Sequence, residues 1–389
     1  MMRRIARAAS LLLAAGLSTA IAGCVGQNAQ LPAAAQPPAK IAPASVRVNF
    51  TRDTLGATAV SGNAGVAGRL VDVDDPVRVA SISKLVVALG AMRLAEQGKL
   101  DLDRDVGLYL GWRVRNPAFP DAPVTMRQLL SHRSGLRDKI DYIVPLDGDL
   151  SLVLGNPEAW EAKHPPGAYF SYANINSPLT AAVMESATGE RFDRLMANLV
   201  LRPLKLDACY NWGDGCSDGR RAQAVTLLRP NGDLARDAAI TGKDPCPVYA
   251  ATDGSCDVEK LYRLGRNGSA FSPQGGLRIS ARDLAKVGQV LLNDGKPLLS
   301  KQSFAEMVGP VWTFDGSNGD DDKGYFKAYG LGVHWLDDGK GEQWIGHVGE
   351  AYSLRAGFWV NRKAGKGIVS YATMVDEFAP VGHCFERCP

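Results

Sequence analysis

The pattern of apolar and polar residues is most regular over residues 78–100, RVASISKLVVALGAMRLAEQGKL. From residue 84 onward, apolar side chains recur at roughly helical spacing, which predicts a helix with one buried face. Helix start and stop signals, such as Thr125, Pro178 and Gly189, mark other segments. We therefore predict further helices over residues 124–130, 177–189, 192–200 and 281–292.

Strand-like segments lie toward both ends of the chain. The early ones, separated by glycines, are residues 46–50, 57–61 and 68–73. The late ones alternate more clearly and have turns at 337–339 and 361–365; they are residues 329–336, 343–347, 354–360 and 367–373. Strands at both ends with helices between them predict one sheet closed by the two ends, with a helical region inserted at about residues 101–270.

Composition and charge narrow the possible functions. The 389 residues are 46% hydrophobic and 22% charged, which is typical of a globular protein with an ample core. Three arginines fall in the first 23 residues, which carry no acidic residue, and the rest of the chain has 41 basic and 41 acidic residues. A neutral mature chain gives no reason to expect nucleic acid or an anionic surface as a partner.

The N-terminus has the features of an export signal. Residues 1–23 combine basic residues, an apolar core and small residues, and the end of this segment, Ile21-Ala22-Gly23-Cys24, resembles the bacterial lipobox. We predict a signal peptide over 1–23, a lipid on Cys24 and an Ala- and Pro-rich tether over 24–45. The protein would then lie on the periplasmic side of the bacterial envelope, with the outer membrane favoured because Val25 follows the cysteine. The alternatives are a simple secretory signal and a short membrane anchor.

The cysteines agree with export. Without Cys24, the seven cysteines become an even set of six, which outside the cytoplasm is typical of disulfides. We favour three local pairs, 209–216, 246–256 and 384–388, and expect long loops over residues 209–269. Zinc is the competing interpretation, but the sequence has no C-x-x-C pair.

Two residues at the start of the helix in segment 78–100 have the chemistry of an activated nucleophile. Ser81 and Lys84 are three residues apart, so they share a helix face and can form a hydrogen bond. A lysine in dry, cationic surroundings can lose its charge and take the proton of the serine hydroxyl. The alternative is a capping serine followed by a surface lysine.

Two later motifs supply possible partners. In the segment PPGAYFSYANINSPL, Tyr172 could relay protons if the positive charge of a lysine lowers the pKa of its phenol, and Asn174 offers a donor and an acceptor. At the end of a late strand, His347 is followed by Gly349, which would let a substrate approach the backbone, and by Glu350, whose N–H could face an oxyanion. Taken alone, the first motif would be interpreted as a packed core tyrosine beside a turn asparagine, and the histidine at a strand end as structural.

Together the three motifs form a known order. S-x-x-K on a helix, Y-x-N in a middle loop and H-x-G on a late strand resemble the serine β-lactamase and penicillin-binding-protein superfamily, in particular its class C β-lactamase-like branch, which includes family VIII carboxylesterases and D-amino-acid peptidases. The similarity covers about residues 46–375. Its supporting stretches are VTMRQLLSHRSGL, FSYANINSPLTAAVMESATGE and FSPQGGLRISARDLAKVGQVLL.

The resemblance implies an α+β fold over residues 46–389: an antiparallel sheet flanked by helices, with an inserted helical sub-domain and the site between them. It implies that Ser81 attacks a carbonyl, that Lys84 and Tyr172 shuttle the proton, and that the N–H groups of Ser81 and Glu350 hold the oxyanion. Asn174 and His347 would contact the substrate. The resemblance requires no metal and no cofactor.

Two departures from the family pattern narrow the substrate. True β-lactamases and D,D-peptidases begin the third motif with a lysine that attracts the substrate carboxylate, whereas His347 is mostly neutral near pH 7. We therefore rank a small-molecule ester or amide first, a D-amino-acid peptide second and a β-lactam third; the alternative is a catalytically weak lipoprotein that binds cell-wall fragments or senses β-lactams. The second departure is the segment 375–389, which contains Pro380 and two cysteines and is unsuited to the terminal helix that the family would place on the sheet. The sequence predicts no oligomeric state.

Overall fold

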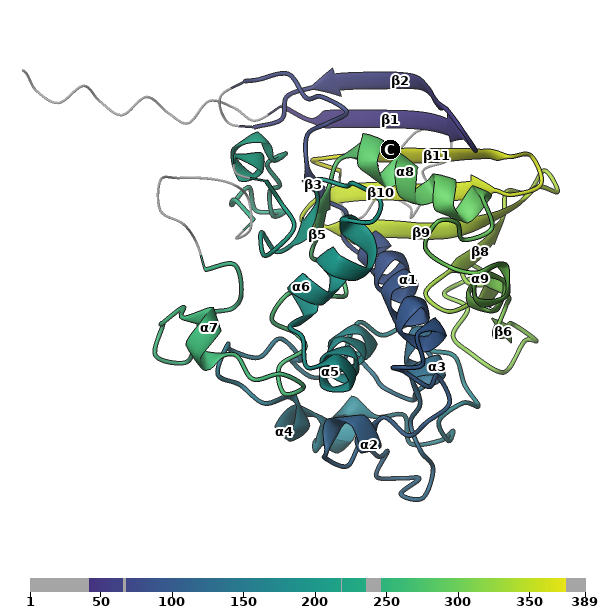
Figure 1. Ribbon diagram of the computed structural model, residues 1–389. Coiled ribbons are helices and arrows are strands. Elements are labelled where there is room, and N and C mark those ends of the chain that lie inside the picture. Colours follow the sequence, from purple (N-terminus) through teal and green to yellow (C-terminus); the bar gives the residue numbers. More distant parts are fainter. Residues whose placement is uncertain (1–41, 66–67, 218, 236–245, 376–389) are drawn as a thin grey trace, which may run out of the picture. The chain divides into compact units, whose positions relative to one another are not determined.

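An eight-stranded antiparallel sheet is the main feature of the computed structural model, which describes residues 42–65, 68–217, 219–235 and 246–375. The strand order is β2-β1-β11-β10-β9-β8-β7-β6. The early strand β1 (Ala44–Thr51) lies between β2 (Leu55–Gly62) and the late strand β11 (Lys366–Ala372) (Figure 1). The predicted sheet closed by the two ends of the chain is therefore confirmed. The other strands are β6 (Trp312–Thr313), β7 (Ala328–Tyr329), β8 (His334–Asp337), β9 (Gln343–Ala351) and β10 (Leu354–Asn361).

The strand predictions need three adjustments. Residues 68–73 form no strand: Leu70 makes one isolated bridge with Asn63, and the chain then turns where the Asp75 carboxylate accepts a hydrogen bond from the N–H of Asp72 (2.7 Å). The single strand expected over 329–336 is divided into β7 and β8. Gly332 turns the chain there with φ +68°, a conformation that L side chains rarely adopt. Strand β1 also begins at residue 44, two residues inside the expected tether.

A second, three-stranded sheet positions the nucleophile segment. Its strands are β3 (Val77–Arg78), β5 (Leu277–Ile279) and β4 (Cys209–Tyr210), in that order. Because β3 ends only three residues before Ser81, this sheet ties the start of the following helix to two late segments of the chain.

The helix that follows, α1 (Ile82–Glu96), is buried over most of its surface. Twelve of its fifteen residues are buried, so the helix lies at the centre of the core. The sequence predicts a helix with only one buried face. Gly332 packs against it, since a Cβ there would lie 2.6 Å from the Cβ of Ala88.

The remaining helices largely follow their sequence signals. The helix α3 begins after Thr125, which forms a capping box with Gln128, and α5 ends at Gly189, whose φ is 72°. The helix α8 begins after Ser280 and covers the predicted residues 281–292. It packs on β1, β10 and β11. The helix α9, capped by Ser300, was not predicted. Helical bounds are α2 Gly107–Leu110, α3 Met126–Leu130, α4 Leu150–Leu154, α5 Asn176–Thr188, α6 Phe192–Met196 followed by a π-helical turn at Ala197–Leu201, α7 Val258–Leu261, α8 Ala281–Leu292 and α9 Lys301–Val308.

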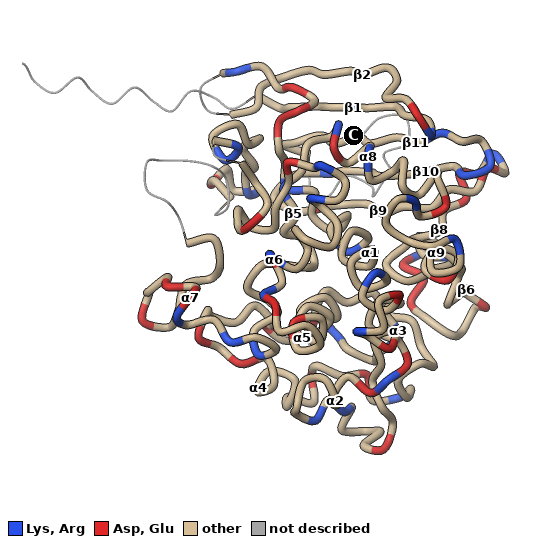
Figure 2. Tube along the Cα trace, viewed as in Figure 1, with Lys and Arg blue, Asp and Glu red and all other residues tan. Residues whose placement is uncertain are grey.

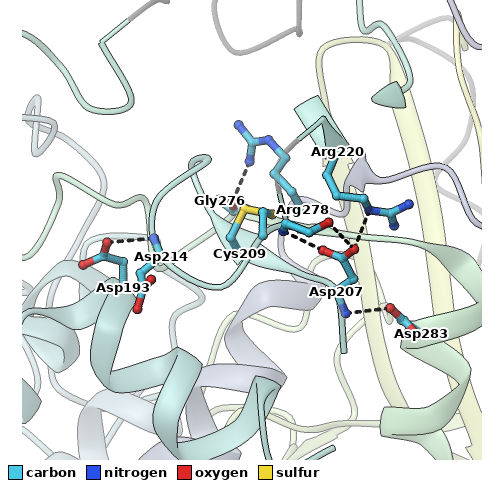
Figure 3. The surroundings of a disulfide bond; sticks show 10 residues. Asp193, Asp207, Cys209, Asp214, Arg220, Gly276, Arg278 and Asp283 are labelled. Atoms are coloured by element: carbon cyan, nitrogen blue, oxygen red, sulfur yellow. Dashed lines mark hydrogen bonds and ion pairs between the residues drawn. A yellow bond between two sulfur atoms is a disulfide. The ribbon is translucent and has the colours of Figure 1, made fainter. Parts of the chain in front are cut away.

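Two of the three predicted disulfides are present, Cys209–Cys216 and Cys246–Cys256. The first closes the loop after β4. Beside it, the Asp207 carboxylate accepts the Ser217 hydroxyl and pairs with Arg220, and the Asp207 N–H donates to Asp283 of α8 (Figure 3). The predicted pair 384–388, the lipid site Cys24 and the questionable terminal helix lie outside the described residues.

Along the described residues, the charged side chains form no segregated pattern. Lys and Arg are interspersed with Asp and Glu along the trace (Figure 2), in keeping with the balanced composition. In the part of the chain that the structure describes, no helix combines the length and apolar character needed to cross a membrane.

Candidate active site

Ser81 lies at the junction between β3 and α1, where its side chain reaches a cavity of about 330 Å³. The residue before it, Ala80, has a φ of 46°, an uncommon conformation for a residue other than glycine. Although Ser81 occupies the N-cap position of α1, its side chain accepts no capping hydrogen bond from the helix. The Ser81 hydroxyl therefore does not cap the helix, so the alternative of a capping serine does not describe this residue.

Lys84 is 4% exposed, and its amine lies among three oxygen atoms. Lys84 Nζ is 2.9 Å from Ser81 Oγ, 2.8 Å from Asn174 Oδ1 and 3.0 Å from the Gln274 carbonyl oxygen. Burial lowers the pKa of Lys84 to about 7, although the Asp138 carboxylate opposes this shift. Near neutral pH a large fraction of this amine therefore carries no charge.

The contacts of Lys84 also orient the neutral amine. The Asn174 Oδ1 and the Gln274 carbonyl can only accept hydrogen bonds, so they take the two N–H groups. The lone pair of the nitrogen then faces Ser81 Oγ, and the hydroxyl donates its proton toward Lys84. In this arrangement the amine could take the proton of the serine hydroxyl.

Tyr172 lies beside the same pair. Its ring centroid lies 4.9 Å from Lys84 Nζ, and its ring stacks on His132 at 4.3 Å. The predicted lowering of the Tyr172 pKa is wrong: burial raises it, because a phenolate would be desolvated here. Tyr172 thus remains protonated and can donate a hydrogen bond to Ser81 Oγ.

Two residues that the sequence did not single out complete this group. Asp138 accepts hydrogen bonds from the Asn174 backbone N–H (2.7 Å), the Asn174 side-chain amide (2.9 Å) and the Ile175 N–H (2.9 Å). Gln274 contributes its backbone carbonyl to Lys84. Asp138 lies two residues after the stretch VTMRQLLSHRSGL and could have been suspected from that position, whereas a backbone carbonyl leaves no signal in the sequence.

His347 lies behind the wall of the cavity. It is 2% exposed and does not line the cavity. Its Nδ1 is 2.6 Å from the Val348 carbonyl, which can only accept, so the proton is on Nδ1 and Nε2 accepts from the Tyr329 hydroxyl at 2.9 Å. Burial, with Lys84 nearby, lowers the pKa of His347 to about 3, so this imidazole is neutral. Both nitrogens are therefore bound within the protein.

This geometry leads to a prediction for His347→Ala. The substitution leaves the Tyr329 hydroxyl buried without its partner, and we expect it to lower the free energy of unfolding by about 1–3 kcal/mol. Tyr329→Phe breaks the same hydrogen bond from the other side and is the matched variant. Denaturant unfolding, with hydrolysis of several esters, measures both effects. A loss that differs strongly between substrates, without loss of stability, would instead indicate direct contact with substrate.

The two residues after Val348 have different surroundings. A Cβ at Gly349 would lie 2.2 Å from the Val79 carbonyl oxygen, so the small residue allows β9 to approach the segment before Ser81. The space beside Gly349 is thus occupied by the protein's own backbone. Glu350 lines the cavity and pairs with the buried Arg355 (3.3 Å). Glu350 is therefore at the edge of the cavity.

The rest of the cavity wall is partly aromatic and is attached to both disulfides. Trp212 lies in the loop closed by Cys209–Cys216, and Tyr249 in the loop closed by Cys246–Cys256. Other residues of the wall include Arg78, Tyr142, Ile143, Asn174, Asn211, Val248, Ser269, Ser272, Gly275 and Tyr352. Among the described residues, His, Cys, Asp and Glu side chains form no group of three or more that could hold a metal ion.

Sequence comparisons relate this chain to a known protein family and to known proteins. Residues 49–381 match the family model described as Beta-lactamase. Esterase EstB of Burkholderia gladioli is 32% identical over 284 residues, which cover 64% of this chain and 67% of that esterase. Protein flp of Staphylococcus aureus is 27% identical over 146 residues, 35% of this chain but only 29% of its own length.

Solved structures agree on the fold. The D-amino acid amidase from Ochrobactrum anthropi SV3, complexed with L-phenylalanine, superposes with a TM-score of 0.64 and 18% identity, over 87% of this chain and 88% of the amidase. The octameric penicillin-binding protein homologue from Pyrococcus abyssi gives a TM-score of 0.62 and 20% identity, over 85% of this chain and 69% of the homologue. The family model spans most of the described domain, and the S-x-x-K, Y-x-N and H-x-G motifs fall within it. The chain therefore belongs to the beta-lactamase family.

Proposed function

We propose that the protein is a serine hydrolase that cleaves an ester or an amide through a covalent acyl-serine intermediate. The observation that carries the proposal is the 2.9 Å contact between Ser81 Oγ and a buried Lys84 whose pKa is about 7. This pair supplies an oxygen nucleophile and a base that is neutral at physiological pH.

The first half of the reaction acylates the serine. Ser81 Oγ attacks the carbonyl carbon of the substrate as Lys84 takes the hydroxyl proton. The oxyanion of the tetrahedral intermediate is held by the N–H groups of Ser81 and Glu350. Lys84, in contact with the serine oxygen, and Tyr172, whose ring lies beside the Lys84 amine, return the proton to the leaving group as its bond to carbon breaks.

The second half restores the enzyme. A water molecule attacks the acyl carbon and gives a proton to the same base. The ester bond to Ser81 then breaks, the proton returns to the serine oxygen, and a carboxylic acid leaves. The overall reaction consumes one water and releases one acid and one alcohol or amine.

The surroundings of the nucleophile favour a small ester or amide as the substrate. His347 is neutral and buried where β-lactam-acting relatives have a lysine, so it supplies no positive charge for a substrate carboxylate. Trp212, Tyr249 and Tyr352 offer apolar surface to an acyl or leaving group. Similarity to an esterase and to the fold of a D-amino acid amidase fits the same ranking, with a D-amino-acid peptide second and a β-lactam third.

The Lys84 base predicts a pH dependence. Only the neutral amine accepts a proton, so kcat/KM for p-nitrophenyl butyrate is expected to rise with pH and to level off above about pH 7, the pKa of Lys84. The acid limb of a pH–rate profile measures this pKa. A rate that is flat from pH 5 to 9 would exclude Lys84 as the base.

Covalent labelling tests the proposed function directly. The protein is treated with a fluorophosphonate probe, and the labelled peptide is identified by mass spectrometry; we expect the mass shift on Ser81. Parallel assays with p-nitrophenyl acetate and butyrate, a D-amino acid amide and nitrocefin rank the substrate classes. Absence of labelling and of all turnover would favour the alternative, a lipoprotein that binds cell-wall fragments or senses β-lactams.

We also propose that the protein acts outside the cytoplasm. The two disulfides and the export-like N-terminus support this location. A lipid on Cys24 would tether the enzyme to the bacterial envelope. Mass measurement of the mature N-terminus separates a lipidated Cys24 from a simple cleaved secretory signal.

A further inference from the structure

We propose that Asp138 is a positioning residue, which fixes the Asn174 amide so that the Lys84 amine presents its lone pair to Ser81. The inference rests on the proposed function, because it assigns Asp138 a role in preparing the general base of that site. Asp138 lies between α3 and α4 and contributes no atom that takes part in the reaction.

Three N–H donors hold the Asp138 carboxylate in place. Oδ2 accepts both the backbone N–H and the side-chain amide of Asn174, and Oδ1 accepts the backbone N–H of Ile175. These are charge-assisted hydrogen bonds of 2.7–2.9 Å, the class that orients its partners most strongly. One carboxylate thus fixes both the backbone and the side chain of the Y-x-N motif.

The chemistry of the carboxylate determines which way the Asn174 amide points. Because an ionised carboxylate can only accept, the NH₂ end of the amide must face Asp138. The oxygen end then faces Lys84, 2.8 Å from Nζ, and takes one N–H of the amine. If the amide were reversed, its NH₂ group would face the amine and compete with Ser81 for the lone pair.

The charge of Asp138 also acts on Lys84 directly. Burial lowers the pKa of Lys84, and the negative Asp138 raises it, so the carboxylate keeps the pKa from falling further. Other titratable side chains that interact with Lys84 in the described part of the chain include Tyr172, His132 and His347. Burial keeps the tyrosine protonated and both histidines neutral, so they do not replace the charge of Asp138.

Asp138→Asn separates these roles from simple structural support. The variant keeps the size of the side chain but loses the charge and one acceptor. We expect kcat/KM for p-nitrophenyl butyrate to fall by about 10- to 100-fold, as for a modest misplacement of catalytic groups. The acid limb of its pH–rate profile is expected to move to lower pH, because the pKa of Lys84 falls when its negative neighbour is removed. A purely structural defect would lower the rate without moving the limb.

Asp141→Asn is the matched control. Asp141 lies three residues further along the same loop, is exposed, and accepts the N–H of Ile143 (3.0 Å). Its substitution removes the same charge from the same loop, and both the rate and the acid limb should remain those of the wild type. Asp138→Glu, which keeps the carboxylate, should return the acid limb toward the wild-type position even if its rate is lower.

A double variant tests whether Asp138 acts through Asn174. If it does, Asp138→Asn combined with Asn174→Ala loses little more activity than Asn174→Ala alone, because the amide to be oriented is already absent. Fully additive losses would contradict the inference. So would an Asp138→Asn enzyme whose acid limb matches that of the wild type.

Two different results would contradict the proposed function and the role of Asp138. If the fluorophosphonate does not label Ser81 in the wild-type protein, the proposed function is contradicted, and the role of Asp138 with it. Wild-type labelling together with an unmoved acid limb in Asp138→Asn would overturn only the inference. Thermal unfolding of each variant identifies any variant that does not fold. If Asp138→Asn does not fold, the acid limb of Asp138→Glu is measured instead.

Discussion

Replacing Ser81 with alanine is expected to lower kcat for every hydrolysed ester or amide by about 10⁶-fold, the loss seen when the nucleophile of a comparable serine enzyme is removed. The proposed acyl-enzyme forms on Ser81 Oγ. Lys84 contacts this oxygen, and the ring of Tyr172 lies beside the Lys84 amine. Without the hydroxyl, the lone pair of Lys84 faces no proton. Steady-state hydrolysis of p-nitrophenyl butyrate measures the effect.

The cavity offers a matched serine for comparison. Ser272 also lines the cavity, but its hydroxyl accepts a hydrogen bond from the Asn211 amide (3.0 Å) instead of contacting a base. The fluorophosphonate mass shift should vanish in Ser81→Ala and persist on Ser81 in Ser272→Ala. Turnover that survives in Ser81→Ala would show that another group is the nucleophile.

Removal of the general base should have the next largest effect. Lys84→Ala is expected to lower kcat by at least about 10³-fold, the usual cost of deleting the group that activates a nucleophile. A serine hydroxyl without a base is largely un-ionised at neutral pH, and the Asn174 and Gln274 oxygens lose their donor. Single-turnover acylation, followed by release of p-nitrophenol, measures the chemical step separately from binding.

Lys84→Met distinguishes loss of the amine from loss of packing. Methionine keeps an unbranched side chain in this buried position but has no basic nitrogen. We expect it to be as inactive as Lys84→Ala and to show no acid limb near pH 7, since that limb belongs to the lysine. A Lys84→Met enzyme with near wild-type rate, or with the acid limb preserved, would assign the base to another residue.

Much of the fold could be predicted because local patterns and the tertiary structure agree. The cap at Thr125, the glycine at residue 189 and the run ending at Leu292 fixed helix ends that the structure places within a residue of the prediction. Strand-like segments late in the chain similarly predicted β9, β10 and β11, although all eight residues of β10 are buried. Where local signals were weak, at residues 68–73 and in the unpredicted helix α9, turn formation and packing decided the outcome.

The candidate site, like the fold, could be predicted only in part from the sequence. Spacing alone brought Ser81 and Lys84 onto one helix face, and the structure places their reactive atoms 2.9 Å apart. Spacing could not give the direction of the Tyr172 pKa, because that depends on how much water the fold removes from around the phenol. It also could not reveal Asp138, whose importance comes from the three N–H groups that the fold turns toward it.

By itself, the sequence determined which reactive groups exist in this protein, their order, and the turn of helix that pairs a hydroxyl with an amine. Only the tertiary structure decided the protonation states of these groups and the burial of His347 behind the cavity wall. The physical reason is that helical spacing is a local property of the chain. Desolvation and the orientation of amides arise only when segments 36 to 190 residues apart, such as Asp138 with Asn174 and Gln274 with Lys84, close around the same few atoms.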